Sequence, residues 1–480
     1  MKRLNLAALG AMLLLPAAAQ TSADGTLSPE LVKSLREGYE MNGEDLARHN
    51  AITNNSINSL ALNRAIVAGE DGLFSHKIKT KGITNQKSSG RCWMFAGLNT
   101  MRPQVIRDLK VDGFEFSMAY LQFWDKMEKS NLYLEDIIEL RKADRLDREW
   151  LLVNEWSTGD GGWWNYVTGL IEKYGVVPAS VMPETHSSDN TRTMNVVLGR
   201  LLRAQAVALM KAHKDGASLE QLRQQKEKSL KEVYRFLVLN LGEPPVEFEW
   251  RYQAGGEKKE DDGQESAAVK NEKLIEAGTF TPKSFYEKFV GVKLSHFVCL
   301  QHDPSQPLGR HYLFDRAANM AGQQDMHFAN IEMEVMKEIA AKSILANEPL
   351  WFAANVSIDQ SSEHGLMEHN LYDYETLFGL DLEISKVDRS IFGVGASNHA
   401  MVLTGVDLKD GKPRKWLVEN SWGDDKGNKG TWTLYDRWFD EHVTTVIVHK
   451  AHVPEDVLKI YESKPEVLPS WYPGAPGVRK

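Results

Sequence analysis

The sequence predicts an α+β protein in which helices dominate the first half of the chain and strands dominate the last third. Helical patterns fill residues 30–66, 118–143 and 191–241. From residue 348 onward, β-type runs such as "PLWFAANVSI" and "HAMVLTGVDL" are separated by turn sequences such as "KDGKPRK". Segregation of helices from strands along the chain is typical of α+β folds, whereas α/β folds alternate them.

The N-terminal residues are expected to lie outside the fold. The basic start "MKR" precedes the short apolar run "LNLAALGAMLLL", and Ala17 and Ala19 form a small-x-small cleavage pattern. We expect a signal peptide at residues 1–19 and export of the mature protein to the periplasm or the cell exterior. A short membrane anchor is the alternative, but the apolar run is too short to cross a bilayer comfortably and no later run is long enough. No membrane span is therefore expected after cleavage.

The composition is that of a soluble globular protein. Of the 480 residues, 42% are hydrophobic and 26% are charged, and the formal net charge is −9. A general nucleic-acid-binding role normally requires a basic stripe or domain, and none stands out, so no specific nucleic acid partner is expected. Because Cys92 and Cys299 are the only cysteines, the chain has no disulfide framework and allows one bridge at most.

The helices and loops are expected in the following order. Ser28-Pro29-Glu30 is a helix start, with a serine cap and a proline at the first helical position. Cys92 opens a further helix, in which Pro103 marks a kink or an end. In residues 159–175 a glycine turn precedes an apolar helical repeat, and residues 253–273 form a charged, glycine-rich stretch typical of a solvated loop.

Cys92 is the residue with the clearest chemical signal. A lone cysteine is more often a small buried side chain than a nucleophile. Here, however, the cysteine stands at the expected start of a helix, directly after "SSGR". The unpaired N–H groups and the dipole at a helix N-terminus favour the thiolate, which is the reactive form of cysteine. Ser89-Gly90 also supplies a turn that can expose the sulfur.

Partners for such a nucleophile are present elsewhere in the chain. A thiolate that performs acyl transfer needs an acid/base, typically histidine, which a third group orients. His399 stands at the start of a strand-like run, and Asn420 stands at the end of the next one, so the two side chains can face each other across a sheet. Gln86 lies shortly before Cys92, where its side-chain amide can donate to an oxyanion beside the Cys92 backbone N–H.

Three stretches, "QKSSGRCW", "NHAMVLTGV" and "ENSWGDDKGNKGTW", resemble the papain-type cysteine peptidases, and among them the bleomycin hydrolase / aminopeptidase C family. Other similar segments, including "GDGGWWNYVTGLIEKYGVVP" and "DRWFDEHV", extend the resemblance from about residue 45 to near the C-terminus. As in the bleomycin hydrolase branch, Ser89 replaces a cysteine of the papain branch, and about three hundred residues separate Cys92 from His399.

The resemblance implies a papain-like fold in one peptidase unit that spans residues 20–480. Its helical N-terminal subdomain carries Cys92, and its strand-rich C-terminal subdomain carries His399 and Asn420. A large helical insertion is expected at about residues 190–250. Because the family forms a hexameric ring, a homohexamer is expected, and peptides are the expected substrates.

The family's residue roles carry over to the matching positions. Cys92 is the expected nucleophile, His399 is the acid and base, and Asn420 orients His399. Gln86 and the backbone N–H of Cys92 form the expected oxyanion hole, and Trp422 shields the contact between the asparagine and the histidine from water. The implied chemistry is amide hydrolysis through a thioester on Cys92, which requires no cofactor and no metal.

Substrate binding is expected to involve the glycine turn and the chain terminus. The residues concerned are Gly161, Gly162, Trp163, Asn398 and Lys480. Trp163 stands where the family commonly has glutamine, which should reshape the wall of the cleft. Lys480 ends the tail, residues 452–480, which the resemblance folds into the cleft so that its terminal carboxylate holds the free amine of a peptide.

This tail arrangement implies an aminopeptidase. Trp471 and Pro473 match the family's Trp-Asp-Pro pattern, but Tyr472 replaces the acidic residue, and the basic tip Arg479-Lys480 should repel a substrate ammonium. Two alternatives therefore stay open: a papain-like endopeptidase with an open cleft, and a non-catalytic peptide-binding ring that has kept the fold. The intact catalytic set argues against the second alternative, because a binding module has no chemical need for it.

Two other signals are not expected to mark functional sites. His364 and His369 do not have the His-Glu-x-x-His spacing of a zinc-binding helix. Cys299 lies in the apolar, strand-like stretch "HFVCLQHD" and is expected to be a buried packing thiol.

Overall fold

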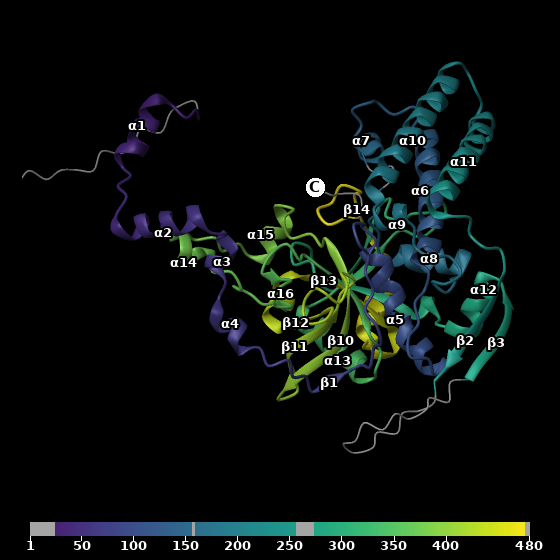
Figure 1. The fold of residues 1–480 in the computed structure, drawn as a ribbon. Helices are drawn as coiled ribbons and strands as arrows, with labels where there is room; N and C mark the ends of the chain where they lie inside the picture. The colour runs from purple at the N-terminus through teal and green to yellow at the C-terminus, as the bar shows by residue number, and fades with distance from the viewer. Residues whose placement is uncertain (1–24, 156–158, 256–272, 476–480) are drawn as a thin grey trace, which may run out of the picture. The chain divides into compact units, whose positions relative to one another are not determined.

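The computed structural model describes residues 25–155, 159–255 and 273–475 (Figure 1). These residues form two compact units: the smaller contains the described residues up to Leu62 together with Tyr372–Asp381, and the larger contains the rest. The expected signal peptide at residues 1–19, most of the charged stretch 253–273 and Lys480 lie outside the described residues.

The smaller unit is helical and brings together two distant parts of the chain. Its helices are α1 (Pro29–Glu37), α2 (Gly43–Asn54), α3 (Ile57–Ala61) and α14 (Tyr374–Phe378). Helix α1 begins as the sequence predicts, because the Ser28 hydroxyl accepts the Leu31 N–H and a proline occupies the first turn. The N–H of Asp373 donates to the carbonyl of Ala61 at 2.8 Å and thereby joins the two parts.

The larger unit contains most of the helices. They are α4 (Arg64–Gly69), α5 (Cys92–Leu109), α6 (Met118–Glu139), α7 (Arg148–Glu155), α8 (Trp164–Tyr174), α9 (His186–Asp189), α10 (Thr191–Lys214), α11 (Leu219–Leu241), α12 (Pro282–Phe285), α13 (Met333–Leu345), α15 (Lys386–Ile391), α16 (Asp436–His442) and α17 (Glu455–Tyr461), with the short turns η1 (Tyr286–Val290), η2 (Leu294–His296) and η3 (Lys450–His452). Helices α10 and α11 occupy the segment 191–241, which the sequence predicts to be helical, and they pack on each other and on α6 (Figure 1). Within the described residues, no helix combines the length and the apolar character that a bilayer crossing requires.

The strands form one large sheet and one separate hairpin. The hairpin pairs β2 (Phe248–Ala254) with β3 (Lys273–Phe280). The large sheet contains β1 (His76–Lys77), β4 (Phe297–Gln301), β5 (Arg310–Phe314), β6 (His327–Asn330), β7 (Leu350–Ala354), β8 (Gln360–Ser361), β9 (Leu366–Met367), β10 (His399–Lys409), β11 (Lys412–Glu419), β12 (Thr431–Tyr435), β13 (Val443–His449) and β14 (Glu466–Leu468). Their order is β14-β5-β6-β4-β13-β7-β10-β11-β12-β9-β8, and β1 pairs with β10.

Strand β10 lies in the interior of the large sheet and positions two candidate site residues. It runs antiparallel to β7 on one side and to β11 on the other. Nine consecutive residues of β10 are buried, which explains its nearly continuous apolar sequence. Because Val402 pairs with Glu419, the first residue of β10, His399, comes close to Asn420, which directly follows β11.

Two apolar cores hold the larger unit together. The first lies between the large sheet and helices α5, α6, α8, α10 and α11, and it includes Leu98, Phe123 and Val167. The second packs α13 against the sheet and includes Ile339 and Leu403. Full burial of each such side chain contributes about 1.5–3 kcal/mol.

Helix α5 continues beyond Pro103 and ends only at Leu109, so the helix end that the sequence allowed at this proline is not observed. A proline in a helix interior costs about 3 kcal/mol. Apolar residues on both sides of it, Met101 and Val105, are buried in the first core. Their burial offsets the cost and keeps the helix intact.

Candidate active site

Cys92 lies at the first helical position of α5, as the sequence predicts, and its side chain is partly exposed. The carbonyl of Arg91 accepts the N–H groups of Met94 and Phe95. The next residue, Trp93, fixes this helix start from two sides. Its indole N–H donates to the Asp160 carbonyl at 2.7 Å, and its own carbonyl accepts the indole N–H of Trp351 at 3.1 Å.

His399 is buried beside Cys92 and makes a side-chain hydrogen bond to it. Its Nε2 lies 2.8 Å from Oδ1 of Asn420, and that oxygen also accepts the Ser421 N–H at 2.8 Å. Since an amide oxygen only accepts hydrogen bonds, Nε2 of His399 carries a proton and Nδ1 is the nitrogen available to the sulfur. Trp422 stacks on the imidazole with ring centroids 4.7 Å apart.

These contacts shift the pKa of the histidine. Burial alone would lower the pKa of His399, but the negative charge and the hydrogen bond of Cys92 outweigh burial. Together with the hydrogen bond to Asn420, they raise the pKa of His399 above its ordinary value of 6.5. The same attraction favours the thiolate of Cys92, so the site is arranged for a thiolate–imidazolium pair.

Gln86 is buried and its amide is held in one orientation. Its Oε1 accepts the hydroxyl of Ser421 at 2.7 Å, and its Nε2 donates to the Ser89 carbonyl at 2.7 Å. A primary amide nitrogen carries two protons, so a second N–H remains for a ligand. The Cys92 backbone N–H lies in the first turn of α5, where helical N–H groups have no intrahelical acceptor.

The glycine turn before α8 passes directly beside Trp93. A Cβ atom added to Gly162 would lie 2.5 Å from the Trp93 ring, so only glycine fits there. Gly161 precedes it, and Trp163 is buried at the start of α8. Asn398 lies directly before His399, but its side-chain atoms hydrogen-bond to the loop after β7, at Asn355, Val356 and Ser357.

Two residues near this site were not among the candidates predicted from the sequence. Ser421 holds the Gln86 amide, and Asp160 accepts the N–H of Gly90 at 3.1 Å, two residues before the nucleophile. The sequence features that could have pointed to them are the hydroxyl of Ser421 directly after Asn420 and the acidic side chain of Asp160 inside a glycine turn. Within the described residues, no three His, Cys, Asp or Glu side chains gather in a way that could hold a metal ion.

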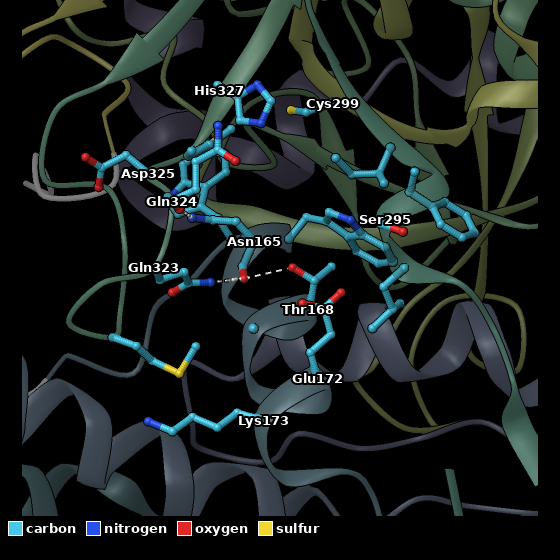
Figure 2. Close-up of a pocket in the computed structure, with 18 of the residues that line it drawn as sticks. Asn165, Thr168, Glu172, Lys173, Ser295, Cys299, Gln323, Gln324, Asp325 and His327 are labelled. Carbon is cyan, nitrogen blue, oxygen red and sulfur yellow. Dashed lines mark hydrogen bonds between the residues drawn. The ribbon is translucent and has the colours of Figure 1, made fainter. Parts of the chain in front are cut away.

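A cavity of about 700 Å³ lies apart from the four candidate catalytic side chains (Figure 2). Asn165 and Thr168 on α8 line one side, where Gln323 donates a hydrogen bond to the Asn165 carbonyl, and Cys299 and His327 lie together at one end. Cys299 is a free thiol that is 7% exposed, and burial raises its pKa well above the ordinary value. Burial therefore favours the protonated thiol of Cys299.

Comparison with known proteins supports the interpretation of this geometry. The model of the Peptidase C1-like family matches residues 26–475. Aminopeptidase C of Streptococcus thermophilus is 37% identical over 451 residues, which cover 93% of this chain and 98% of the relative. Bleomycin hydrolase of Gallus gallus is 35% identical over 461 residues, with the same coverage of 93% and 98%.

A solved structure extends the match to the fold. The crystal structure of PepW from Lactobacillus rhamnosis has a TM-score of 0.87 and 35% identity, and the match covers 94% of this chain and 99% of that one. The predicted papain-like fold with mixed helix and sheet content is thereby confirmed. The chain belongs to the Peptidase C1-like family of cysteine peptidases, the family of its aminopeptidase C and bleomycin hydrolase relatives.

Proposed function

We propose that this protein is a cysteine aminopeptidase that hydrolyses peptides through a thioester on Cys92. One observation carries the proposal: Cys92 stands at the start of a helix, and consecutive hydrogen bonds connect it to His399 and His399 to Asn420. The similarity to aminopeptidase C supports the exopeptidase specificity. A peptide-binding scaffold would have no use for this series.

In the first half of the reaction, the thiolate of Cys92 attacks the carbonyl carbon of the scissile amide. The resulting oxyanion accepts hydrogen bonds from Nε2–H of Gln86 and from the backbone N–H of Cys92. As the C–N bond breaks, Nδ1–H of His399 protonates the leaving amine. The acyl group then remains on the sulfur as a thioester.

In the second half, the neutral imidazole of His399 takes a proton from water at Nδ1 while the water oxygen attacks the thioester. The C–S bond breaks, the carboxylic acid leaves, and the thiolate–imidazolium pair is restored. Asn420 keeps the ring oriented throughout because its Oδ1 accepts Nε2–H. As a neutral partner, it leaves the imidazolium charge available to the thiolate, and Trp422 covers the ring.

The contacts of the C-terminal tail support the proposal that residues are removed from the amino end of a peptide. The guanidinium carbon of Arg148 lies over the indole of Trp471, 4.7 Å from the ring centroid of the tryptophan. The hydroxyl of Tyr472 donates to Asp303 at 2.5 Å. The next residues, Pro473 and Gly474, line a pocket together with Trp163 and Ser397, close to His399. We infer that the tail narrows the cleft on the side of the substrate's amino end, which favours removal of single residues.

An assay with fluorogenic aminoacyl amides tests the proposal. The intact protein should cleave substrates that have a free amino group and should not cleave their N-blocked counterparts. A variant without residues 477–480 should accept blocked substrates better, and Cys92→Ala should cleave neither. Equal cleavage of blocked and free substrates by the intact protein would show an endopeptidase with an open cleft instead.

Export and assembly also remain proposals. We propose that residues 1–19 direct export and that the mature protein acts as a homohexamer, as its family resemblance implies. Mass spectrometry of the protein from cell fractions would locate the mature N-terminus. Light scattering coupled to size-exclusion chromatography would give the oligomer mass. A full-length cytosolic monomer would contradict both proposals.

A further inference from the structure

A buried salt bridge holds the glycine turn that borders the candidate site. Nζ of Lys126, on α6, lies 2.7 Å from Oδ1 of Asp160 and 3.3 Å from the Gly159 carbonyl. The lysine side chain is 1% exposed and the aspartate side chain is 10% exposed. Removing either partner would leave a charge without its counter-charge in a region from which water is largely excluded.

A second lysine from the same helix holds the same turn. Lys129 lies three positions after Lys126 and therefore on the same face of α6. Its Nζ donates to the Gly161 carbonyl at 2.7 Å, to the Gly159 carbonyl at 3.0 Å and to Asp125 at 2.8 Å. The ammonium also lies 5.4 Å from the ring centroid of Trp93. The backbone on both sides of Asp160 is thus fixed by cationic donors.

Asp160 links this turn to the nucleophile and to helix α10. Its Oδ2 accepts the Gly90 N–H at 3.1 Å and the hydroxyl of Thr191 at 2.5 Å. Its Oδ1 accepts the amide of Asn195 at 2.8 Å as well as the lysine. One carboxylate therefore joins three segments: the loop that leads into Cys92, helix α6 and the first turns of α10.

The charges of this cluster balance one another. Burial disfavours the ionised Asp160, but the charge and hydrogen bond of Lys126, together with the hydrogen bonds of Thr191 and Asn195, outweigh burial and hold the pKa of Asp160 far below its usual range. Asp125 forms an ion pair with Lys129 at 2.8 Å. Two carboxylates and two ammonium groups thus form a neutral unit that is well suited to a rigid role in the interior.

We propose that Asp160 and Lys129 are positioning residues for peptide hydrolysis, an inference that rests on the proposed function. Asp160 fixes the loop at Gly90 and so the sulfur of Cys92. Lys129 fixes the carbonyl of Gly161 and so the glycine turn beside which substrate would lie. The two residues therefore act on different partners of the same reaction, one on the nucleophile and the other on the substrate.

Separate kinetic signatures follow from this division. A displacement of about 1 Å in an active site can cost about 100-fold in rate. Asp160→Asn should lower kcat about 10-fold or more and should slow alkylation of Cys92 by iodoacetamide, a probe that needs no substrate site. Lys129→Met should raise KM about 10-fold and leave that alkylation rate unchanged, while Lys129→Arg, which keeps charge and donors, should return KM toward the wild-type value.

Milder and matched variants keep the test decisive if a substitution impairs folding. Thr191→Val removes one donor to Asp160 on the α10 side and should slow Cys92 alkylation in the same direction. Asp436→Asn is the control, because Asp436 pairs at 2.9 Å with another buried lysine, Lys337, on the opposite core. It should lower the melting temperature without changing kcat, KM or the alkylation rate.

The experiment separates the inference from the proposed function. If Asp160→Asn and Thr191→Val match the wild type in Cys92 alkylation and in kcat while losing stability as Asp436→Asn does, the positioning role of Asp160 is overturned. An unchanged KM in Lys129→Met overturns the role of Lys129. If the wild type cleaves no peptide yet Cys92 alkylation slows in Asp160→Asn, the proposed function fails and the control of the nucleophile loop by Asp160 stands.

Discussion

Ser421→Ala would isolate the contribution of one hydroxyl to the oxyanion hole. The Ser421 hydroxyl donates to Oε1 of Gln86 at 2.7 Å, and the two residues are 4% and 7% exposed. Without the hydroxyl, the buried amide oxygen has lost its donor, and the amide can rotate away from the oxyanion. The net loss of one such hydrogen bond is about 0.5–1.5 kcal/mol. This loss corresponds to a decrease in kcat of about 2- to 12-fold.

The comparison with Gln86→Ala makes the prediction sharper. Removal of a complete oxyanion donor costs about 10²- to 10³-fold in kcat. Because Ser421 acts only through Gln86, the double variant should have the kcat of Gln86→Ala alone. The assay is steady-state hydrolysis of a fluorogenic aminoacyl amide with each of the three variants.

The control is Ser343→Ala, since Ser343 is also buried and its hydroxyl donates to the Glu348 carbonyl, away from the site. This control should lower stability and leave kcat unchanged. The reasoning is refuted if Ser421→Ala lowers kcat by the same factor whether or not Gln86 is present. In that case the hydroxyl would act on the reaction by another route.

Three further predictions concern charge, pH and packing. Asn420→Asp places a negative charge beside the imidazolium and should raise the pKa of His399 further, so the alkaline limb of the kcat/KM profile should move to higher pH; an unmoved limb would contradict this. Burial and the neighbouring His311 lower the pKa of His327 from 6.5 to about 4. The unfolded chain therefore binds more protons between these values, and stability should fall by up to about 3 kcal/mol as the pH drops from 6.5 to 4. His327→Gln should flatten this acid limb in urea unfolding, and an equally steep limb would count against the assignment. Gly162→Ala directs a methyl group at a ring atom 2.5 Å away and should lower kcat/KM about 10-fold or more, whereas wild-type kinetics would show that the turn can move.

Local sequence pattern was sufficient to predict the positions of site residues that lie at the ends of helices and strands. Cys92 follows a Gly-Arg turn and precedes an apolar helical repeat, so its position at a helix start could be expected from the sequence. His399 and Asn420 flank strand-like runs, and antiparallel pairing of these strands brings the two together. The family resemblance could be recognised for the same reason, because its motifs lie at these element ends.

The supporting residues could not be predicted in this way. Asp160 and Thr191 meet across separate segments, and Ser421 reaches Gln86 across most of the chain. In α6, Lys126 is polar and would be placed on a solvated face of an amphipathic helix, yet the structure buries it against the glycine turn. Such contacts depend on tertiary packing and leave no periodic signal in the sequence.

Local sequence pattern also does not show which distant segments of the chain pack into one unit. Residues 372–381 belong to the smaller unit with the N-terminal helices, although more than three hundred residues separate them in sequence. Pro103 is a related case, because a proline predicts a helix break from local geometry alone. Burial of its neighbours in the core outweighs that preference and carries α5 onward to Leu109.

The most direct test of the catalytic account is the pH dependence of Cys92 alkylation by iodoacetamide, followed by mass spectrometry of the Cys92 peptide. A thiolate–imidazolium pair predicts rapid alkylation at pH 6, well below the ordinary thiol pKa of about 8.5. In His399→Ala, this reactivity at pH 6 should disappear. If the wild type and His399→Ala instead follow the same curve with a midpoint near 8.5, Cys92 is an ordinary thiol and the proposed mechanism is wrong.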